Sequence, residues 1–315
     1  MKRYEPASRR RSPGKKRVAL ISWNGLPHGA ESERLVLPHL TSAGVDARFV
    51  DWRDPALDIT QFDLAVLRTC WDYHLRIAEF LNWLQRTACT VPMLNTLETV
   101  LWNYSKFYLQ KLEAQGIEIA PTVFVADGSL SAGDRERVLG WQKVVAKPAV
   151  SATAYNMWMT DSDRFLQGNE AAQKMQGPYL VQQFVPEVVT NGEISFIYID
   201  GSYSHAVLKR AATGEFRVQR DFGGSAEPFH PSAALLEQAN GIAAAVSHVR
   251  DSLYCRIDAV ERDGRLLLME LELIEPELFL GLADGAAENF AAAIIRRLEK
   301  DSPQIYARKA DRTEQ

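Results

Sequence analysis

Apolar and polar positions alternate in two different ways along the first third of the chain. Short apolar runs, typical of buried strands, predict strands over 17–22, 45–50, 63–68 and 91–94. Apolar residues at helical spacing predict helices over 31–43, 77–84 and 103–115, the last ending at Gly116. Because strands and helices take turns, we predict an N-terminal parallel α/β domain over 18–118.

The pattern changes after residue 118, where strand-like runs follow one another with polar turns between them. This texture is typical of α+β folds with antiparallel pairs. We expect strands over 121–125, 143–147, 157–159, 179–181, 193–199, 204–208, 217–220, 253–260 and 266–273, and helices over 232–251 and 284–299. The predicted organisation is therefore a tail over 1–17, the domain over 18–118, a central subdomain over 119–181, a C-terminal domain over 182–300 and a tail over 301–315.

Length and composition place the chain among ordinary globular proteins. Its 315 residues are 46% hydrophobic and 24% charged, which suggests about two domains. No apolar run approaches the roughly 20 residues that span a bilayer, and the longest, 266–282, holds four glutamates. The three cysteines follow no metal or redox spacing. We expect a cytoplasmic protein with free thiols.

The charge is unevenly distributed. Residues 1–17 hold eight basic residues against one acid, a net charge of +7. Because the whole chain has a net charge of −4, the remaining residues carry −11. A basic arm can attract nucleic acid or membrane, but this one lacks helical periodicity and interleaved aromatic residues. We interpret it as a disordered tail, and the acidic body argues against a broad nucleic-acid interface.

Several common catalytic motifs are absent from the sequence. There is no G-x-x-x-x-G-K-[ST], no G-x-G-x-x-G after the first strand, no G-x-S-x-G and no H-E-x-x-H. The six histidines do not pair with cysteines at metal spacing. The sequence therefore gives no support for a P-loop nucleotide-binding protein, a dinucleotide-binding fold, a serine hydrolase or a zinc enzyme.

The strongest candidate chemistry is a pair of carboxylate-bearing strands near the C-terminus. Glu270 and Glu272 project from one face of a strand, as Arg256 and Asp258 do on the preceding one. A three-residue loop over 263–265, containing Asp-Gly, would pair position 258 with position 270. Three carboxylates on one patch repel unless a cation offsets them, and oxygen ligands of this kind suit Mg²⁺. A solvent-facing edge strand is the alternative.

Other segments are individually ambiguous. Lys147 ends a buried-looking strand, so it either meets a bound anion or reaches solvent. Residues 181–185 could offer backbone groups to a planar ligand or simply end a strand. Residues 214–225 combine basic side chains with a Gly pair, which fits a cationic lid as well as an ordinary hairpin.

Taken in order, these pieces resemble the ATP-grasp superfamily, in its glutathione-synthetase-like branch that includes the D-cycloserine-forming cyclo-ligase. The segments that carry the resemblance span about 18–295 and are 68–74, 102–109, 120–122, 146–152, 182–186, 192–195, 200–201, 204–207, 216–219 and 269–276. The resemblance implies an ATP-grasp fold, with a parallel α/β domain, a small central lid subdomain and a C-terminal α+β domain.

The resemblance also implies a role for each matching residue. Nucleotide contacts would come from Lys106, Lys147, Ser151 in the phosphate lid, the adenine hinge Gln182, Gln183, Phe184 and Val185, and Glu193 on the ribose. Mg²⁺ would be held by Asp258, Glu270 and Glu272. Lys209, Arg210, Arg217 and Arg256 would neutralise the transferring phosphoryl group. Arg68, Trp71, Asp72 and Tyr73 would face the substrate.

Two positions depart from the family pattern. The third metal ligand is usually Asn but is Glu272 here, and the lid after Lys147 reads Ser-Ala-Thr-Ala rather than being rich in glycine.

The activity implied is that of an ATP- and Mg²⁺-dependent ligase that joins a carboxylate to an amine through an acyl phosphate. Phosphoryl transfer of this kind needs positioning and charge neutralisation but no protein nucleophile. The alternatives are an intramolecular cyclo-ligase and a non-catalytic nucleotide-binding module. The expected partners are a small amino-acid-like substrate and, as in many relatives, further copies of the chain, with neither nucleic acid nor membrane.

Overall fold

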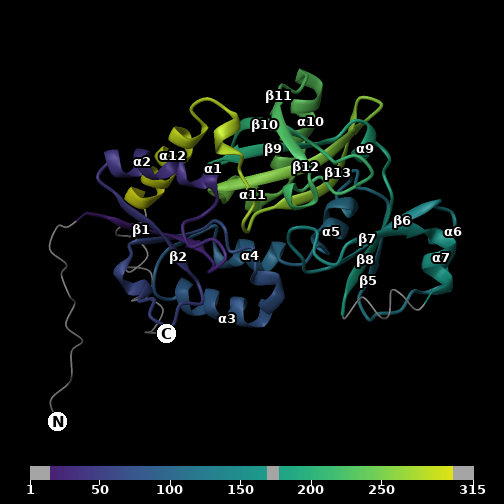
Figure 1. Ribbon diagram of the computed structural model, residues 1–315, viewed down its shortest axis with the longest axis horizontal. Coiled ribbons are helices and arrows are strands. Elements are labelled where there is room, and N and C mark those ends of the chain that lie inside the picture. Colours follow the sequence, from purple (N-terminus) through teal and green to yellow (C-terminus); the bar gives the residue numbers. More distant parts are fainter. Residues whose placement is uncertain (1–14, 169–176, 301–315) are drawn as a thin grey trace, which may run out of the picture.

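The computed structural model describes residues 15–168 and 177–300 and builds them around three sheets (Figure 1). The prediction of a disordered basic tail concerns mainly residues 1–14, which lie outside the described residues, as does the tail over 301–315. Within the described part, no helix has the length and apolar character needed to cross a membrane.

The first sheet is parallel, as predicted, with the strand order β2-β1-β3-β4. Its strands are β1 (Arg17–Ser22), β2 (Asp46–Asp51), β3 (Leu64–Leu67) and β4 (Met93–Leu94). Its helices are α1 (Glu31–Arg34), α2 (Val36–Ser42), α3 (Ile77–Ala88) and α4 (Leu97–Asn103). The helix predicted over 31–43 is thus divided at Leu35.

Alternate residues of the central strands β1 and β3 enter two different cores. Leu20 and Val66 pack with α2 and with α12 (Ala286–Lys300), whereas Ile21 and Leu67 pack with α3. Period-two alternation with helices on both faces is what a doubly covered parallel sheet requires. The last helix of the described chain therefore returns to lie beside α2 in the first sheet's layer (Figure 1).

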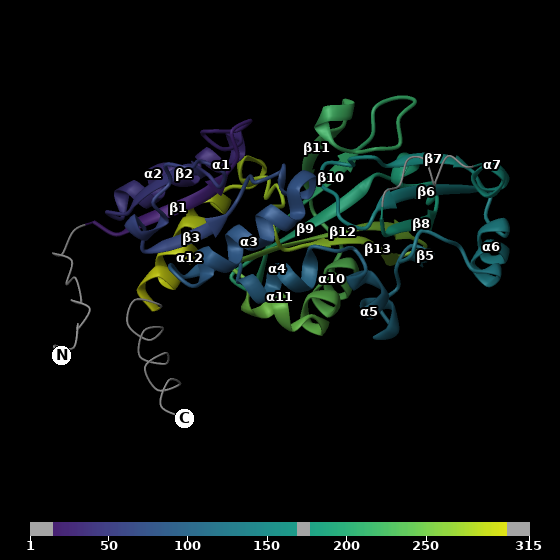
Figure 2. The same cartoon turned by 90° about the horizontal axis from the view of Figure 1, so that it is seen from below.

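The second sheet is antiparallel, with the order β5-β8-β6-β7. Its strands are β5 (Thr122–Val125), β6 (Lys143–Pro148), β7 (Trp158–Asp161) and β8 (Tyr179–Gln183). The helices α6 (Ala132–Leu139) and α7 (Ser162–Gln167) pack with it through Val138 and Phe165. This unit forms one end of the molecule, and the first sheet lies toward the other end (Figure 2).

The third sheet is also antiparallel, with the order β11-β10-β9-β12-β13. Its strands are β9 (Glu193–Ile199), β10 (Ser202–Arg210), β11 (Ser225–Phe229), β12 (Tyr254–Arg262) and β13 (Arg265–Glu272). Nearby helices are α5 (Tyr108–Ala114), α9 (Glu187–Thr190), α10 (Ala233–Ala245) and α11 (Ser247–Asp251). The single helix predicted over 232–251 breaks at Val246.

Two further predictions about local structure are wrong. The strand expected over 217–220 is irregular chain that leads into a 3-10 helix (Arg220–Phe222), and the edge strand β11 follows it. The Glu215 carboxylate accepts the backbone N–H groups of Phe216 and Arg217 (2.8 and 3.1 Å), which a strand would have used for pairing. The helix expected over 103–115 begins only at Tyr108, as α5, while Asn103 is the last residue of a separate helix, α4. In the break between them the backbone N–H of Lys106 donates to the carbonyl of Ala149 (2.7 Å).

The hairpin of β12 and β13 pairs Asp258 with Glu270, as predicted, but by a different route. Its turn has two residues rather than three, with Asp263 and Gly264 at φ +52° and +77° between the paired Arg262 and Arg265. Such a turn alone would set Asp258 opposite position 269. A β-bulge leaves Met269 without a partner and restores the pairing to Glu270.

The bulge also changes which face each residue of β13 presents. Before it, Leu266 and Leu268 enter the core of the third sheet, and after it Leu271 and Leu273 do. A regular strand with Leu268 in the core would direct Glu270 there as well, because side chains alternate with a period of two. The extra residue instead sends both glutamates to the face that carries Asp258.

The outer edge of β13 is occupied by side chains and backbone from other segments. The amide of Asn103 donates to the carbonyl of Leu271 and accepts from the N–H of Leu273 (2.8 and 2.9 Å), while the hydroxyl of Tyr108 accepts from Leu271 (2.9 Å). Further along, Leu268 bonds to backbone of residues 118 and 120. The end of α4 and the start of α5 therefore hold this edge strand in place.

We expect alanine at the hairpin turn to destabilise the protein through backbone strain alone. Nothing lies within 4 Å of a Cβ built on Gly264 or on Gly241 of α10, but only Gly264 has a positive φ. Gly264→Ala should lower the free energy of unfolding by about 1 kcal/mol, whereas Gly241→Ala, inside a helix, should raise it by about 1 kcal/mol. Urea denaturation measures both. If both alanine variants changed the free energy of unfolding in the same direction, the two-residue turn would be contradicted.

Candidate active site

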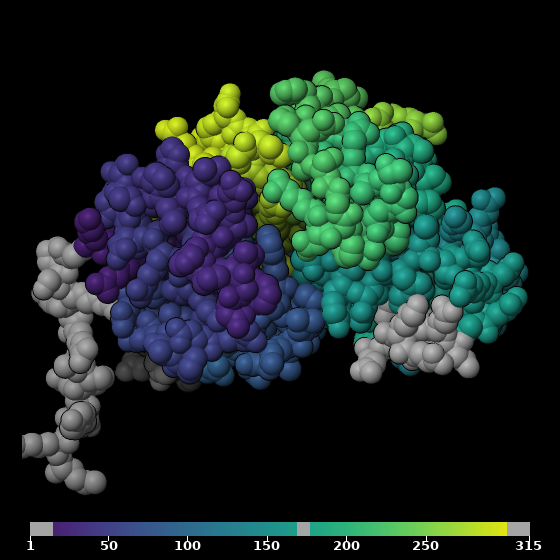
Figure 3. Space-filling view, in the orientation of Figure 1, coloured from purple at the N-terminus to yellow at the C-terminus, as the bar shows by residue number. Residues whose placement is uncertain are grey.

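A cavity of about 380 Å³ lies between the first sheet's loops and the β12–β13 hairpin. In Figure 3 a hollow separates the purple and blue N-terminal residues from the green residues of the third sheet. Expected site residues that line the cavity are Trp71, Tyr73, Lys106, Lys147, Ser151, Lys209, Arg256, Glu270 and Glu272. Segments far apart in the sequence thus converge on one cavity.

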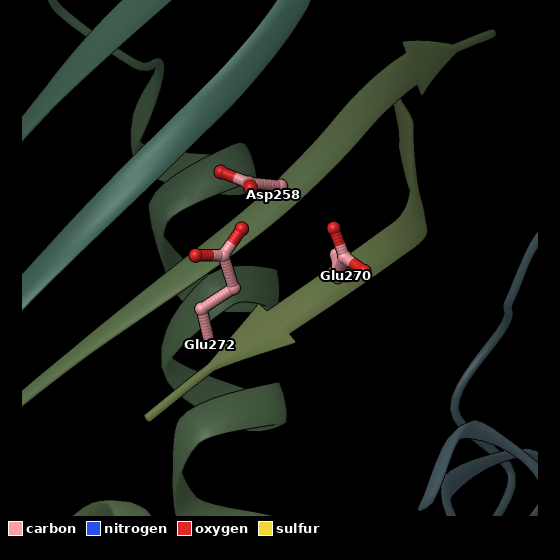
Figure 4. A group of neighbouring side chains, drawn as sticks. All are labelled: Asp258, Glu270 and Glu272. Atoms are coloured by element: carbon pink, nitrogen blue, oxygen red, sulfur yellow. The ribbon is translucent and has the colours of Figure 1, made fainter. Parts of the chain in front are cut away.

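Three carboxylates form the centre of the site. One oxygen each from Asp258, Glu270 and Glu272 lies within 4.8 Å of the other two, and the three side chains point toward one another in front of the hairpin (Figure 4). Oxygen-only ligands gathered at this separation are the donor set that Mg²⁺ prefers. The residues therefore fit a magnesium ion. Glu270 and Glu272 do lie on the edge strand β13, but their side chains are half-buried and line the cavity.

Basic side chains surround these carboxylates. The ammonium nitrogen of Lys106 lies 2.6 Å from Glu270, that of Lys209 lies 3.2 Å from Asp258, and Arg256 binds Asp258 (3.0 Å) and Glu272. Lys147 is buried and makes no ion pair with any described residue. Four cations thus converge on three carboxylates, an arrangement able to take additional negative charge from a bound phosphate.

The pKa values of the carboxylates follow from burial opposed by these cations. Burial alone would raise the pKa of Asp258, but Arg256 and Lys209 hold it well below its usual range. Burial raises the pKa of Glu272 to about 7, and the neighbouring carboxylates Asp258 and Glu270 act in the same direction. The positive charge of Arg256 opposes this shift only in part. Burial also lowers the pKa of the Lys147 ammonium, although Glu270 acts in the opposite direction.

Arg68 and Asp72, expected to face the substrate, do not line the cavity. The Arg68 guanidinium is buried, pairs with Glu33 through two nitrogens (2.6 and 2.7 Å) and lies over the Tyr254 ring. The Asp72 carboxylate accepts from the Trp52 indole (2.8 Å). Both side chains are bound by internal partners, which stabilise the fold, whereas the neighbouring Trp71 and Tyr73 line the cavity.

Two of the four expected phosphate-neutralising residues also lie elsewhere. The exposed Arg210 approaches Glu227 (3.4 Å), and Arg217 pairs with Glu215 (2.6 Å) and lies over the Phe222 ring. Arg220, which was not predicted, lines the cavity and has no carboxylate partner among the described residues. Its place in the basic 214–225 segment was visible in the sequence, but the two arginines there, Arg217 and Arg220, were equivalent.

The expected adenine hinge and ribose ligand lie outside the lining of this cavity. The Gln182 amide donates to Thr122 (2.9 Å), the N–H of Gln183 to Pro121 (2.8 Å) and that of Phe184 to Lys143 (2.9 Å). Glu193 lies 2.5 Å from Lys209. Burial raises the pKa of Glu193, although Lys209 opposes this shift. A nucleotide role for residues 182–185 and for Glu193 remains a prediction.

The lid after Lys147 lines the cavity with Ser151, Ala152, Thr153 and Ala154. Thr153 and Ala154 have φ values of +50° and +55°, a conformation that glycine adopts more readily. The lid is thus a strained loop rather than a glycine-rich one, and the Lys106 ammonium donates to the carbonyl of Ser151 (2.8 Å) beneath it.

Two residues of the site were missed by the sequence analysis besides Arg220. Asn103 lines the cavity and, as described above, bonds to both sides of Glu272 on β13. Glu275 is buried at the cavity wall. Burial raises the pKa of Glu275 to about 8, and the negative charge of the nearby Glu272 contributes to the same shift. A single Asn or Glu carries no spacing signal, so only the folded arrangement distinguishes them.

The arrangement of the three sheets is that of the ATP-grasp fold. Residues 142–278 match the RimK-like ATP-grasp domain, and residues 18–95 match the N-terminal domain of the D-cycloserine synthetase DcsG. Both matches agree with the resemblance seen in the sequence.

More specific similarity is to proteins of cycloserine formation. The chain is 29% identical over 280 residues to the cycloserine biosynthesis protein DcsG of Streptomyces lavendulae, covering 82% of this chain and 91% of that protein. The crystal structure of the D-cycloserine synthetase DcsG matches with a TM-score of 0.78 and 25% identity, covering 90% of this chain and 99% of the other.

A more distant structure shares the fold. The ATP complex of the D-alanine–D-alanine ligase from Bacillus anthracis matches with a TM-score of 0.65 at 18% identity, covering 90% of this chain and 98% of the other.

We expect removal of the Arg68 charge to destabilise the fold. Arg68→Met leaves the Glu33 carboxylate buried without its partner, which should cost about 3–5 kcal/mol in urea denaturation. The double variant Glu33→Gln/Arg68→Met should lose less than the single one, because no unpaired charge remains. A single variant as stable as the parent would contradict the structural role of this ion pair.

Proposed function

We propose that the protein is an ATP- and Mg²⁺-dependent ligase that forms a C–N bond between a carboxylate and an amine of a small amino-acid-like substrate, releasing ADP. The observation that carries this proposal is the cluster of Asp258, Glu270 and Glu272 surrounded by four basic side chains in one cavity. Together with the ATP-grasp fold, it provides charge neutralisation for phosphoryl transfer, which needs no protein nucleophile.

The carboxylates would hold magnesium, and the cations would hold the phosphates. Bound Mg²⁺ supplies positive charge that offsets the phosphate oxygens and lets three carboxylates approach one another. Lys106 and Lys147 would contact the nucleotide phosphates, with Ser151 in the lid above them. Residues Gln182 to Val185 would bind adenine and Glu193 the ribose hydroxyls.

The reaction proceeds in two steps. A substrate carboxylate oxygen attacks the γ-phosphorus of ATP, and the bond to ADP breaks. The amine then attacks the acyl carbon, loses a proton and displaces inorganic phosphate. Arg256 and Lys209 would stabilise the charge on the transferring group, joined by Arg220 in place of Arg210 and Arg217. Trp71 and Tyr73 would shield the acyl phosphate from water.

An intramolecular version of this reaction is the second candidate. It is favoured by the match of residues 18–95 to the N-terminal domain of a D-cycloserine synthetase, because this segment includes Trp71 and Tyr73 of the cavity wall. In that case one substrate would carry both the carboxylate and the attacking nitrogen. We also propose a cytoplasmic location and a homo-oligomeric state, as expected from the resemblance.

ADP release tests the proposal and separates its versions. With Mg·ATP present, a ligase should release ADP only when a carboxylate and an amine substrate are both supplied, a cyclo-ligase with one compound, and a nucleotide-binding module with none. A panel of amino acids and their derivatives, tested singly and in pairs, decides among the three. Release of no ADP from any combination, despite Mg·ATP binding, would leave only the binding module.

Glu270→Gln should lower the rate of ADP release by about 100-fold, because the neutral amide offers less negative charge to the metal and leaves Lys106 without its carboxylate partner. Glu261→Gln is the matched control, since Glu261 lies on the same hairpin, is also half-buried and does not line the cavity. Full activity of Glu270→Gln would show that the metal assignment is wrong.

A further inference from the structure

The segment that follows β13 is held rigidly at the cavity wall. Its consecutive carbonyls each accept a hydrogen bond from a different side chain. The carbonyl of Ile274 accepts from Tyr254 (2.8 Å), that of Glu275 from Trp71 (2.9 Å), that of Pro276 from Arg68 (3.0 Å) and that of Glu277 from Arg256 (3.1 Å). The backbone of Glu275 is therefore fixed, and its side chain has a defined position beside the cavity.

The Glu275 side chain is buried yet has no partner. It is 7% exposed and lines the cavity, but its carboxylate makes no hydrogen bond or ion pair with any residue of the described ranges 15–168 and 177–300. The nearest strong cations are already engaged, Lys106 with Glu270 and Arg256 with Asp258 and Glu272. A buried carboxylate without a cation is unfavourable, so this position is suited to a positive charge brought by a ligand.

The surroundings of Glu275 favour an organic cation over a metal ion. The oxygens that can share one metal belong to Asp258, Glu270 and Glu272, and Glu275 is outside that group. The cavity wall next to Glu275 in the chain is formed by Ile274 and, further along, Phe279, and the adjoining loop contributes Trp71 and Tyr73. An apolar and aromatic wall suits a compact ammonium group, whereas a hydrated Mg²⁺ requires further oxygen ligands.

We propose that Glu275 binds the ammonium group of an amino-acid substrate and thereby selects α-amino acids over analogues without the amine. This inference rests on the proposed function and assigns one end of the substrate. Glu270, Glu272 and Glu275 line the same cavity, so a molecule whose ammonium binds Glu275 would have its remainder in the space shared with the carboxylate cluster. Trp71 and Arg68 are positioning residues for this contact, since they hold the backbone of residues 275 and 276.

Ligand binding to the full-length protein tests the proposal without requiring turnover. Isothermal titration in the presence of Mg·ADP would use both enantiomers of serine and alanine. Glycerate and lactate are the matched probes, because each carries a hydroxyl where the amino acid carries its ammonium. The wild type should bind at least one amino acid about tenfold or more tightly than its hydroxy analogue.

The variants separate charge from hydrogen bonding. Glu275→Gln should weaken binding of that amino acid by about tenfold or more, reduce its preference over the hydroxy analogue and leave Mg·ATP binding unchanged. Glu275→Asp should keep part of the preference because it keeps the charge. Glu261→Gln, outside the cavity, should behave as the wild type.

Two results would overturn the proposal. One is a Glu275→Gln variant that binds the amino acid as well as the wild type, which would mean that the side chain acts as a neutral group. The other is a wild type that binds Mg·ATP but none of the four amino acids better than its hydroxy analogue. Failure of the proposed function is distinguishable, because it would appear as absence of Mg·ATP binding or of ADP release with every substrate tested.

Discussion

A β-strand presents alternate residues to opposite faces, and β13 must satisfy two incompatible demands under that constraint. Its leucines have to fill the core of the third sheet on both sides of position 269, while Glu270 and Glu272 have to face Asp258 across the hairpin. The unpaired Met269 resolves the conflict by shifting the alternation by one residue. The carboxylate cluster, the cations that pair with it and the cavity wall at Glu275 all depend on that shift.

The site also depends on segments that hold β13 from outside the sheet. Asn103 and Tyr108, at the end of α4 and the start of α5, occupy the free edge of the strand, and Arg68 reaches from the first sheet to Pro276 just beyond it. The loop that carries Trp71 and the strand that carries Glu270 and Glu272 are thus parts of one hydrogen-bonded unit. Trp71 contributes to this unit because its indole donates to the carbonyl of Glu275, just beyond β13.

Periodicity in the sequence was enough to predict the parallel first sheet, most strands and the pairing of Asp258 with Glu270. The loop length was wrong, and the correct pairing resulted because a shorter turn and a bulge offset each other. Residue type alone could not separate Arg68 from Arg256, or Arg217 from Arg220, because each is an arginine near a predicted strand or turn. Which of them reaches the cavity depends on long-range partners such as Glu33 and Glu215.

The central claim is that a substrate carboxylate becomes phosphorylated in this cavity. The most direct test is transfer of ¹⁸O from a labelled substrate carboxylate to the phosphate released during turnover. The account predicts one ¹⁸O atom in each phosphate molecule, because the carboxylate oxygen attacks phosphorus and leaves with it when the amine displaces the acyl phosphate. Unlabelled phosphate, or release of AMP and pyrophosphate, would contradict an acyl-phosphate mechanism.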